Sequence, residues 1–509
     1  MTRERVSRRT AMRGVAGGVV GSLLGRLPGW FSEGSTTNRY GPALDLSVPD
    51  GGCPRPSPSK LQAHTSSNGS FFVRDDGRIA ILQGANMVDK TKQPPHYPAS
   101  EISSADIKRI ASWGFNFVRL GIQWAKLTPT RPPSPSAVDS AVDESYVTRL
   151  RTLVRNLARH DVSVLLDMHQ DFFSDVFDGN GAPKWAVYDD NIPFVDTDPW
   201  WTSYLQPAVL AAFDNFWENR GRIQEYFARM WRTVADRFGT ETNVVGYDIF
   251  NEPTPGSGSP ISFEREWLTP FTNRVIERIR EVDDDTAIWV EPGIFFGGGI
   301  PSRIGRVDDP ADNVAFSFHS YPELLADADR VTNRLPVDFD VSAVGHRHIA
   351  RNAVETADRL GAVPVMTEFG AHPDPADVRD GLTAAADAMI GWAYWQYKPW
   401  NGTPRSWLYS DGHVSKNLHE LVRPYPQAIA GYPESWSYDR ESRRFALEYR
   451  PRRGVNPDTV VYVPERAYGG AYELTVNGGT PVCRTREYVH VRHQTAEKNV
   501  TISITPEDA

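Results

Sequence analysis

Between residues 79 and 397, eight short strand-like runs alternate with segments of helical periodicity, and this alternation constrains the fold more than any other feature of the chain. Several runs are continuously apolar, as expected for parallel strands that are buried on both faces. The predicted strands are 79–86, 115–122, 162–169, 244–251, 287–291, 314–319, 363–368 and 392–397. The predicted helices include 103–113, 146–160, 223–238, 263–282, 350–360 and 375–389. Eight such units predict an α/β fold, a (β/α)8 TIM barrel. A doubly wound sheet is the alternative, but the chain lacks the Gly-x-Gly-x-x-Gly sequence that would favour it.

After about residue 432 the helical segments stop, and short alternating runs follow that are separated by turn residues. They lie at residues 444–449, 459–463, 472–476, 488–491 and 500–504. This pattern predicts a C-terminal β-sandwich, which either packs against the barrel or binds carbohydrate or lipid. The predicted domains are therefore an export signal at 1–30, a linker at 31–69, the barrel at 70–431 and the β-sandwich at 432–509.

Residues 1–30 contain six arginines and one acidic residue, and Arg8 and Arg9 form a pair before a Gly-rich, weakly apolar run. A paired arginine before such a run predicts a twin-arginine export signal and therefore a secreted protein. A basic or disordered tail is the alternative. The complete chain has a formal net charge of −9, so nucleic acid is not an expected partner, and we expect a monomer.

The chain has two cysteines, Cys53 and Cys483. Export would permit a disulfide between them, which would link the early linker to the C-terminal region. Two free thiols are the alternative. Neither cysteine has a histidine or another cysteine at the spacing of a metal site.

Polar residues gather where the predicted barrel strands end, which is where barrel enzymes carry their catalytic groups. The segments concerned are Arg119 in the second strand, Asp167 to Asp171 after the third, Asn251-Glu252-Pro253 after the fourth, His319-Ser320-Tyr321 after the sixth, Glu368 after the seventh, and Trp395 with Lys398 in the eighth. Glu252 and Glu368 thus follow strands about half a barrel apart. Two carboxylates that flank one bond are what glycoside hydrolysis requires. One must stay protonated and the other ionised, and Arg119 could hold the second charged.

A single glutamate after a strand is usually a helix cap or an ion-pair partner, and two other kinds of site are alternatives for this set of residues. His169, His319, Asp167 and the two glutamates could bind a metal, but no His-Glu-x-x-His helix is present. A serine-based triad lacks its Gly-x-Ser-x-Gly turn. We therefore expect neither a metal nor another cofactor.

The segment Phe250-Asn251-Glu252-Pro253, together with Glu368 at the end of a later strand, resembles family 5 of the glycoside hydrolases. Three further segments resemble the endoglycoceramidase subgroup of that family: 167–171 (Asp-Met-His-Gln-Asp), 179–185 (Gly-Asn-Gly-Ala-Pro-Lys-Trp) and 423–431 (Arg-Pro-Tyr-Pro-Gln-Ala-Ile-Ala-Gly). The resemblance implies a retaining hydrolase that releases intact glycan and ceramide from glycosphingolipids. Glu252 would then be the acid/base and Glu368 the nucleophile. The substrate-binding residues that the resemblance implies are Lys90, Arg119, His169, Asp171, Asn251, His319, Tyr321 and Trp395.

The resemblance leaves the sugar next to ceramide open. Lys92 is an alternative to Lys90, and the segment 395–400 departs from the subgroup's pattern. A galactosylceramide-type linkage is therefore an alternative to a glucosylceramide-type one.

A long, aromatic-rich insertion follows the third predicted strand, in a chain in which 11% of residues are aromatic. Trp201, Phe213 and Trp217 are the candidates for a groove that holds the acyl chains of a lipid. The alternative is that these residues pack a helix onto the barrel wall.

Two other functions are compatible with the sequence. The first is a family 5 β-glucanase or β-glucosidase that acts on soluble β-glucosides. The second is a non-catalytic glycolipid-binding protein, although binding alone does not require two glutamates together with Arg119 and His319.

Overall fold

A computed structural model describes residues 53–90, 102–197, 200–324, 344–371, 374–398, 407–410, 412–495 and 498–507. The predicted export signal and residues 31–52 of the predicted linker lie outside this range. Within it, no helix has the length and apolar character needed to span a membrane.

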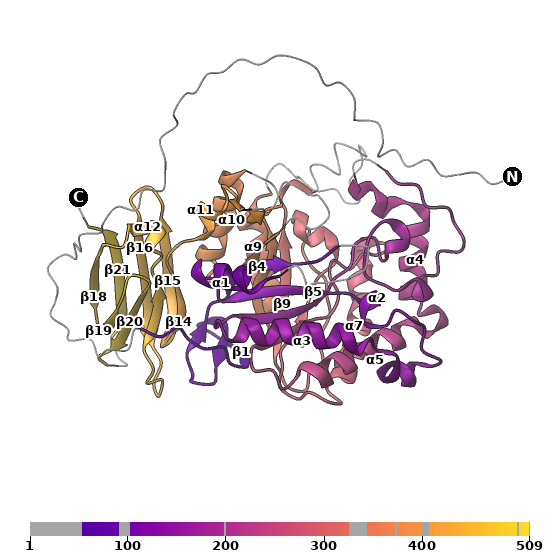
Figure 1. The fold of residues 1–509 in the computed structure, drawn as a ribbon, viewed down its shortest axis with the longest axis horizontal. Coiled ribbons are helices and arrows are strands. Elements are labelled where there is room, and N and C mark those ends of the chain that lie inside the picture. The colour runs from indigo at the N-terminus through magenta and orange to yellow at the C-terminus, as the bar shows by residue number, and fades with distance from the viewer. Residues whose placement is uncertain are drawn as a thin grey trace, which may run out of the picture. The chain divides into compact units, whose positions relative to one another are not determined.

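Among the described residues, eight parallel strands close into a barrel in the order β10-β11-β4-β5-β6-β7-β8-β9, which confirms the predicted TIM barrel (Figure 1). The strands are β4 (Gln83–Met87), β5 (Phe117–Ile122), β6 (Ser163–Met168), β7 (Val244–Asp248), β8 (Ile288–Val290), β9 (Val314–Ser320), β10 (Val363–Phe369) and β11 (Gly391–Tyr394). Every residue of these strands is buried. Their apolar runs therefore reflect burial on both faces of the sheet, as predicted.

Helices connect the strands and cover the outside of the barrel. They are α1 (Ser104–Ser112), α2 (Trp124–Leu127), α3 (Glu144–Ala158), α4 (Pro207–Trp217), α5 (Ile223–Phe238), α6 (Pro260–Phe263), α7 (Thr269–Ile279), α9 (His346–Leu360), α10 (Pro375–Asp387) and α11 (Leu418–Leu421). Local sequence explains several of their ends: Ser103 and Asp106 form a capping box on α1, and Asp374 caps α10 ahead of Pro375. The single helix predicted at 263–282 is divided, because a π-helical turn at Glu264–Leu268 separates α6 from α7.

The predicted β-sandwich consists of two antiparallel sheets that share one hydrophobic cluster. The larger sheet contains β1 (Leu61–Ser66), β2 (Gly69–Arg74), β3 (Ile79–Ala80), β14 (Tyr425–Ile429), β17 (Thr459–Tyr462), β20 (Tyr488–His493) and β19 (Gly479–Arg484). The smaller sheet contains β15 (Gly431–Asp439), β16 (Arg444–Pro451), β21 (Val500–Pro506) and β18 (Tyr472–Asn477). A short helix, α12 (Glu465–Tyr468), joins β17 to β18, and β12 (Tyr409–Ser410) pairs with β13 (His413–Val414) elsewhere in the chain.

The domain boundaries predicted from the sequence differ from this arrangement. Strand β1 lies in the predicted linker, and β2, β3 and β14 lie in the predicted barrel range, yet all four belong to the larger sheet of the sandwich. The strand predicted at 79–86 is in fact two strands, since β3 pairs with β14 whereas β4 joins the barrel. Pairing between strands that are far apart in the chain decides which sheet a strand joins. Local periodicity predicts a strand but does not indicate its partner.

The hairpin of β1 and β2 closes one end of the barrel. Its Leu61 and Phe72 belong to a hydrophobic cluster with residues from inside the barrel, such as Phe117 and Trp289. The rings of Phe72 and Trp289 stack with centroids 5.3 Å apart. These interior residues lie toward the N-terminal ends of the strands, so the opposite, C-terminal end is left for the polar residues.

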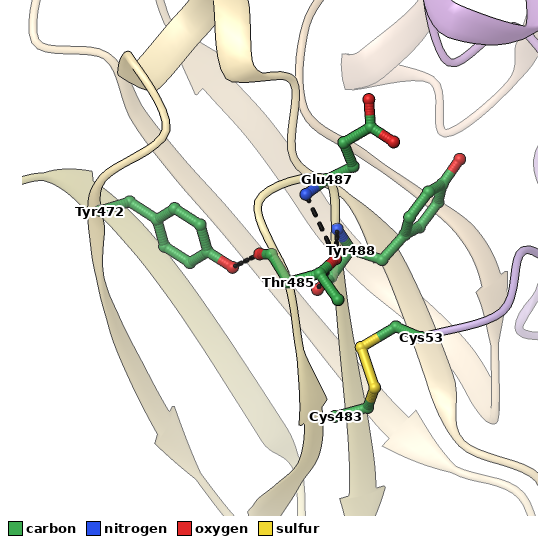
Figure 2. Close-up of a disulfide and its surroundings, with 6 residues drawn as sticks. All are labelled: Cys53, Tyr472, Cys483, Thr485, Glu487 and Tyr488. Atoms are coloured by element: carbon green, nitrogen blue, oxygen red, sulfur yellow. Dashed lines mark hydrogen bonds between the residues drawn. A yellow bond between two sulfur atoms is a disulfide. The ribbon is translucent and has the colours of Figure 1, made fainter. Parts of the chain in front are cut away.

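Cys53 and Cys483 form a disulfide across a sequence separation of 430 residues (Figure 2). This outcome decides between the two alternatives that the sequence left open. Cys483 lies on β19, the last strand of the larger sheet, close to a turn in which the Thr485 hydroxyl accepts hydrogen bonds from the N–H groups of Glu487 and Tyr488. The disulfide therefore fastens the segment before β1 to the far edge of the sheet that contains β1.

Candidate active site

The two glutamates predicted as catalytic lie face to face at the C-terminal end of the barrel. Glu368 lies on β10, and Glu252 follows β7. One carboxylate oxygen of each glutamate and one ring nitrogen of His319 all lie within 4.8 Å of one another. The side chain of Glu252 is 19% exposed, whereas that of Glu368 is 6% exposed, so Glu252 is the more accessible of the two.

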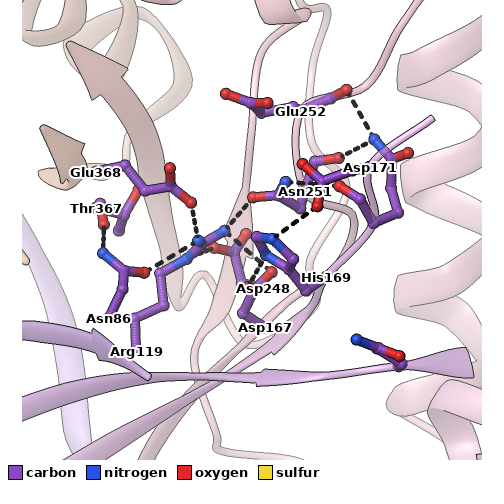
Figure 3. Close-up of polar contacts among 12 residues, drawn as sticks. Asn86, Arg119, Asp167, His169, Asp171, Asp248, Asn251, Glu252, Thr367 and Glu368 are labelled. Carbon is purple, nitrogen blue, oxygen red and sulfur yellow. Dashed lines mark hydrogen bonds and ion pairs between the residues drawn. The ribbon is translucent and has the colours of Figure 1, made fainter. Parts of the chain in front are cut away.

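Arg119 from β5 is the centre of the polar network below this pair (Figure 3). Its side chain is completely buried. Its guanidinium donates to Glu368 Oε1 at 2.6 Å, Glu291 Oε1 at 2.5 Å, Asp248 Oδ2 at 2.9 Å and Asn251 Oδ1 at 2.9 Å, and it lies 3.0 Å from Asp167 Oδ1 and 3.3 Å from Asn86 Oδ1. Burial lowers the pKa of Arg119, but the surrounding acids raise it by more, so the cation is permanent.

The acids around Arg119 share one cation, and their pKa values are shifted in different directions. Burial raises the pKa of Asp248 well above its usual range, and the neighbouring Glu291 raises it further. For Glu291, burial raises the pKa, but His319 and Arg119 lower it to about 2. Glu291 is thus ionised at neutral pH, whereas the protonated form of Asp248 is favoured, as expected when like charges crowd a site of low dielectric.

Both oxygens of Glu368 are held by donors. Arg119 Nη1 donates to Oε1, and the Tyr321 hydroxyl donates to Oε2 at 2.9 Å. Burial raises the pKa of Glu368, the charges of His319 and Arg119 oppose that rise, and the net pKa lies above the ordinary value of a glutamate. Burial and the charge of Glu368 also raise the pKa of Tyr321 well above its usual range, so Tyr321 remains a neutral donor. Glu368 is therefore aimed and ready to act as a nucleophile once it is ionised.

Glu252 is positioned through its main chain as well as its side chain. Its backbone has a φ of +45°, in the left-handed region, and its N–H donates to Glu291 Oε2 at 2.8 Å. Its carboxylate contacts His319 Nδ1 at 2.9 Å. Burial lowers the pKa of His319, but Glu368 and Glu291 raise it to well above the usual value. The shift favours the positively charged form of His319, which lies between the two glutamates predicted as catalytic.

The remaining predicted sugar-binding residues form one wall of the site. The ring of His169 stacks on that of Trp395 with centroids 5.5 Å apart, and Lys90 Nζ lies 4.6 Å from the centre of the Trp395 ring. Lys90 also pairs with Asp171 at 2.7 Å. Burial raises the pKa of Asp171, but Lys90 and His169 lower it to below its usual value. An aromatic ring beside a paired cation and anion is suited to a sugar ring and its hydroxyls.

Three other polar residues near the predicted strand ends differ in how they relate to the site. Asn251 donates through Nδ2 to Gln170 O at 3.0 Å, in addition to its contact with Arg119. Lys398 is directed away from the site, because its Nζ pairs with Asp106 at the start of α1 at 2.8 Å. Lys92, the alternative to Lys90, lies outside the described residues.

The prediction of Phe213 and Trp217 as lining residues of a lipid groove is wrong, because both are buried, with exposed fractions of 0% and 4%. Phe213 packs edge-on against Phe173. Trp217 packs against Phe263 and donates from its indole N–H to Thr254 O at 2.8 Å. Helix α4 thus turns its large apolar side chains toward the barrel wall, which was the alternative interpretation.

Trp201 is half-buried, and the neighbouring Trp200 is 58% exposed. The ring of Trp200 lies 5.5 Å from that of Phe172, which directly follows Asp171. An exposed indole that the sequence did not single out therefore packs against the residue that follows Asp171 in the chain.

Sequence reasoning also missed the partners of Arg119. It considered Asp167 only as a possible metal ligand and did not name Asn86, Asp248 or Glu291 as site residues. The signal was present, since each of these residues is polar and lies in or directly after a buried apolar strand. Asp167, Asp248 and Glu291 place carboxylate oxygens within 4.8 Å of one another, and the guanidinium of Arg119 supplies the positive charge that such a group needs.

Comparisons with known proteins agree with this geometry. Residues 80–401 match the cellulase family, glycosyl hydrolase family 5, and residues 423–505 match the glycoside hydrolase family 5 C-terminal domain. Endoglycoceramidase I of Rhodococcus hoagii (strain 103S) is 30% identical over 429 residues, which cover 81% of this chain and 82% of that protein. The lactosyl-enzyme intermediate of endo-glycoceramidase II from Rhodococcus sp. has a TM-score of 0.74 and 32% identity, and covers 86% of this chain and 100% of that chain. The complex of the same protein with ganglioside GM3 has a TM-score of 0.75 and 31% identity with the same coverage.

Proposed function

The chain belongs to family 5 of the glycoside hydrolases, and from its relatives and its site we propose that it is an endoglycoceramidase. It hydrolyses the β-glycosidic bond between the glycan and the ceramide of glycosphingolipids. The observation that carries this proposal is the pair of glutamates whose carboxylate oxygens lie within 4.8 Å of each other, one of them held by Arg119 and Tyr321. The relatives named above, which share the barrel and the C-terminal domain, support the choice of a glycolipid over a soluble glucan.

The mechanism proposed is double displacement with retention of configuration. The short separation of the two carboxylates favours it, because inverting enzymes need about 6.5–9.5 Å between the groups to admit a water molecule. The endo-glycoceramidase II from Rhodococcus sp. has been captured as a lactosyl-enzyme intermediate, which supports a covalent intermediate in that relative.

In the first step, a carboxylate oxygen of ionised Glu368 forms a bond to the anomeric carbon. The bond from that carbon to the ceramide oxygen breaks, and Glu252 gives its proton to this oxygen. In the second step, Glu252 takes a proton from water, the water oxygen bonds to the anomeric carbon, and the bond to Glu368 breaks. Intact ceramide and a glycan with a free anomeric hydroxyl are the products, and Glu252 and Glu368 return to their starting protonation states.

The wall formed by Trp395, Lys90 and Asp171 is the proposed binding site for the sugar attached to ceramide. The ring of Trp395 lies under the apolar face of that sugar, while Lys90 and Asp171 hydrogen-bond to its hydroxyls. Glucose and galactose differ in the direction of the 4-hydroxyl. Which of the two is bound therefore depends on where this hydroxyl lies relative to Lys90 and Asp171. The exposed Trp200 and the half-buried Trp201 are the proposed contacts of the lipid.

The protein is further proposed to be secreted through a twin-arginine signal within residues 1–30. The disulfide between Cys53 and Cys483 supports an oxidising destination, since such bonds are rare in the cytosol. Replacing Arg8 and Arg9 by lysine should abolish export of the folded protein. Unchanged secretion of that variant would contradict the proposal.

The experiment that tests the function is incubation of the purified protein with a panel of glucosyl- and galactosyl-linked glycosphingolipids and with carboxymethylcellulose. Mass spectrometry of the products should show intact glycan and intact ceramide, and the preferred lipid identifies the sugar. Glu368→Gln, which keeps the size of the side chain but removes its charge, is the matched control and should be inactive. Shortened glucan with untouched glycolipid would instead favour a soluble β-glucan substrate, and no product from any substrate would favour a binding protein.

A further inference from the structure

Glu291 is a buried carboxylate, directly after β8, that touches both halves of the catalytic machinery. Its Oε1 accepts from Arg119 Nη2 at 2.5 Å, and its Oε2 accepts from the backbone N–H of Glu252 at 2.8 Å. The side chain is 2% exposed. Glu291 therefore bridges the cation that holds the nucleophile and the main chain that carries the acid/base.

The contact with the N–H of Glu252 is made at a backbone position that is hard to maintain. Glu252 has a backbone φ of +45°. Residues other than glycine rarely adopt this left-handed conformation unless their surroundings impose it. The carbonyl of Glu252 accepts from Gln170 Nε2 at 3.2 Å and from the Thr254 hydroxyl at 3.2 Å. Glu291 is thus the charged member of the set of groups that hold this peptide in place.

Glu291 also reaches the side chain of Glu252 through His319. His319 Nδ1 lies 2.9 Å from Glu252 Oε1, and His319 Nε2 lies 3.5 Å from Glu291 Oε1. The imidazole is 5% exposed and is flanked by Glu368 at 3.6 Å from the same Nε2. The orientation of the ring, and with it the orientation of the Glu252 carboxyl group, depends on the acids that face Nε2.

We propose that Glu291 is a positioning residue for the acid/base, which it acts on through the main-chain N–H of Glu252 and through His319. This inference rests on the proposed function, because it assumes that Glu252 transfers the proton to the leaving group. Glu291 touches no reacting atom itself. Its role is to place the Glu252 carboxyl group where the glycosidic oxygen lies, so its loss impairs proton transfer and leaves nucleophilic attack by Glu368 largely intact.

Asp248 provides the matched comparison. It too is a buried acid that accepts from Arg119, at 2.9 Å, but its other hydrogen bond is to the Ser317 hydroxyl at 2.9 Å. No contact between Asp248 and Glu252 or His319 is present among the described residues. Asp248→Asn and Glu291→Gln therefore both replace the carboxyl group of a buried acid beside the same guanidinium by an amide, but only the second affects the support of Glu252.

The test compares two aryl β-lactosides. Hydrolysis of 2,4-dinitrophenyl β-lactoside needs little acid assistance, because its leaving group is already a weak base, whereas phenyl β-lactoside depends on proton transfer. Glu291→Gln should lower kcat/KM about 10- to 100-fold for the phenyl substrate and at most about threefold for the dinitrophenyl substrate. Asp248→Asn should lower both values by the same factor.

Sodium azide gives a second readout, since it attacks a glycosyl-enzyme without the help of a base. Azide should accelerate turnover of the dinitrophenyl substrate by Glu291→Gln and yield β-lactosyl azide, which NMR identifies, as it should for Glu252→Ala. Glu291→Asp, which keeps the charge beside Arg119 but is one methylene too short to reach both partners, should behave in the same way and serves if the glutamine variant fails to fold.

Two outcomes separate the failure of this inference from the failure of the proposed function. If Glu252→Ala shows the dependence on the leaving group and the rescue by azide, but the Glu291 variants lose activity equally on both substrates, the positioning role is overturned. If Glu252→Ala itself shows neither effect, the assignment of Glu252 as acid/base is wrong, and the proposed mechanism fails with it.

Discussion

Removal of the Tyr321 hydroxyl tests how the site keeps its nucleophile ionised. That hydroxyl donates to Glu368 Oε2 at 2.9 Å, while Arg119 Nη1 donates to Oε1 at 2.6 Å. Tyr321→Phe removes the first bond and leaves the ring and the second bond in place. A hydrogen bond to a charged group contributes about 1.5–3 kcal/mol, and one pKa unit corresponds to about 1.4 kcal/mol. The substitution should therefore raise the pKa of Glu368 by about one to two units.

The direction of the effect on activity follows from the charge that the reaction needs. Glu368 attacks only when it is ionised, so kcat/KM falls as the pH drops through its pKa in the free enzyme. Burial already raises this pKa above the ordinary value. In Tyr321→Phe the acidic limb of the pH profile should move further upward by about one to two pH units, and at a fixed pH below the limb the rate should fall about 10- to 100-fold.

The assay is the pH dependence of kcat/KM on a soluble aryl β-glycoside, which avoids effects of pH on lipid dispersion. Tyr247→Phe is the matched control, because Tyr247 on β7 is also a tyrosine that donates to a carboxylate, that of Asp283 at 2.6 Å. Asp283 has no part in the site, so the control should lose stability without moving the acidic limb. An unmoved limb in Tyr321→Phe, with activity close to that of the wild type, would refute the role of this hydroxyl.

Three further predictions concern other parts of the molecule. Cys53→Ser should lower the free energy of unfolding, measured with denaturant, by about 2–5 kcal/mol. It should leave kcat on an aryl glycoside unchanged, because the disulfide partner Cys483 lies in the sandwich. Unaltered unfolding would show that the disulfide contributes nothing to stability. Trp217→Ala should destabilise the fold by about 3–5 kcal/mol. It should reduce the activity per folded molecule equally on glycolipid and on aryl glycoside. A selective loss of activity on glycolipid would contradict the packing role of Trp217. Lys90→Met should raise KM about tenfold or more, since it leaves the buried Asp171 without its ion-pair partner; an unchanged KM would remove Lys90 from the sugar site.

Much of the catalytic site could be read from strand ends. In a parallel barrel the C-terminal ends of all strands meet at one face. A polar residue that follows a buried apolar run is therefore predicted to lie at that face. That rule found Glu252, Glu368, Arg119, His319 and Tyr321, and the structure brings them together. The same rule applies to Glu291, which ends the fifth predicted strand, at 287–291.

The rule could not say which apolar residues face a ligand. Phe213 and Trp217 have the composition expected of a lipid groove, yet both are buried against the barrel. Exposure depends on which side of α4 meets the neighbouring elements, and the sequence of α4 is apolar on most sides. The exposed Trp200, which precedes α4, was not distinguished from them by the sequence.

The amino-acid sequence by itself determined the order of strands and helices, the class of barrel and the position at strand ends of the two glutamates proposed as catalytic, because local periodicity and strand ends are properties of neighbouring residues. Tertiary structure alone decided the rest. It joined β1, β2, β3 and β14 to the sandwich, paired Cys53 with Cys483, and placed four acids around Arg119. These outcomes depend on contacts between residues hundreds of positions apart. The charge each acid carries depends in turn on its neighbours and its burial, which exist only once the chain has folded.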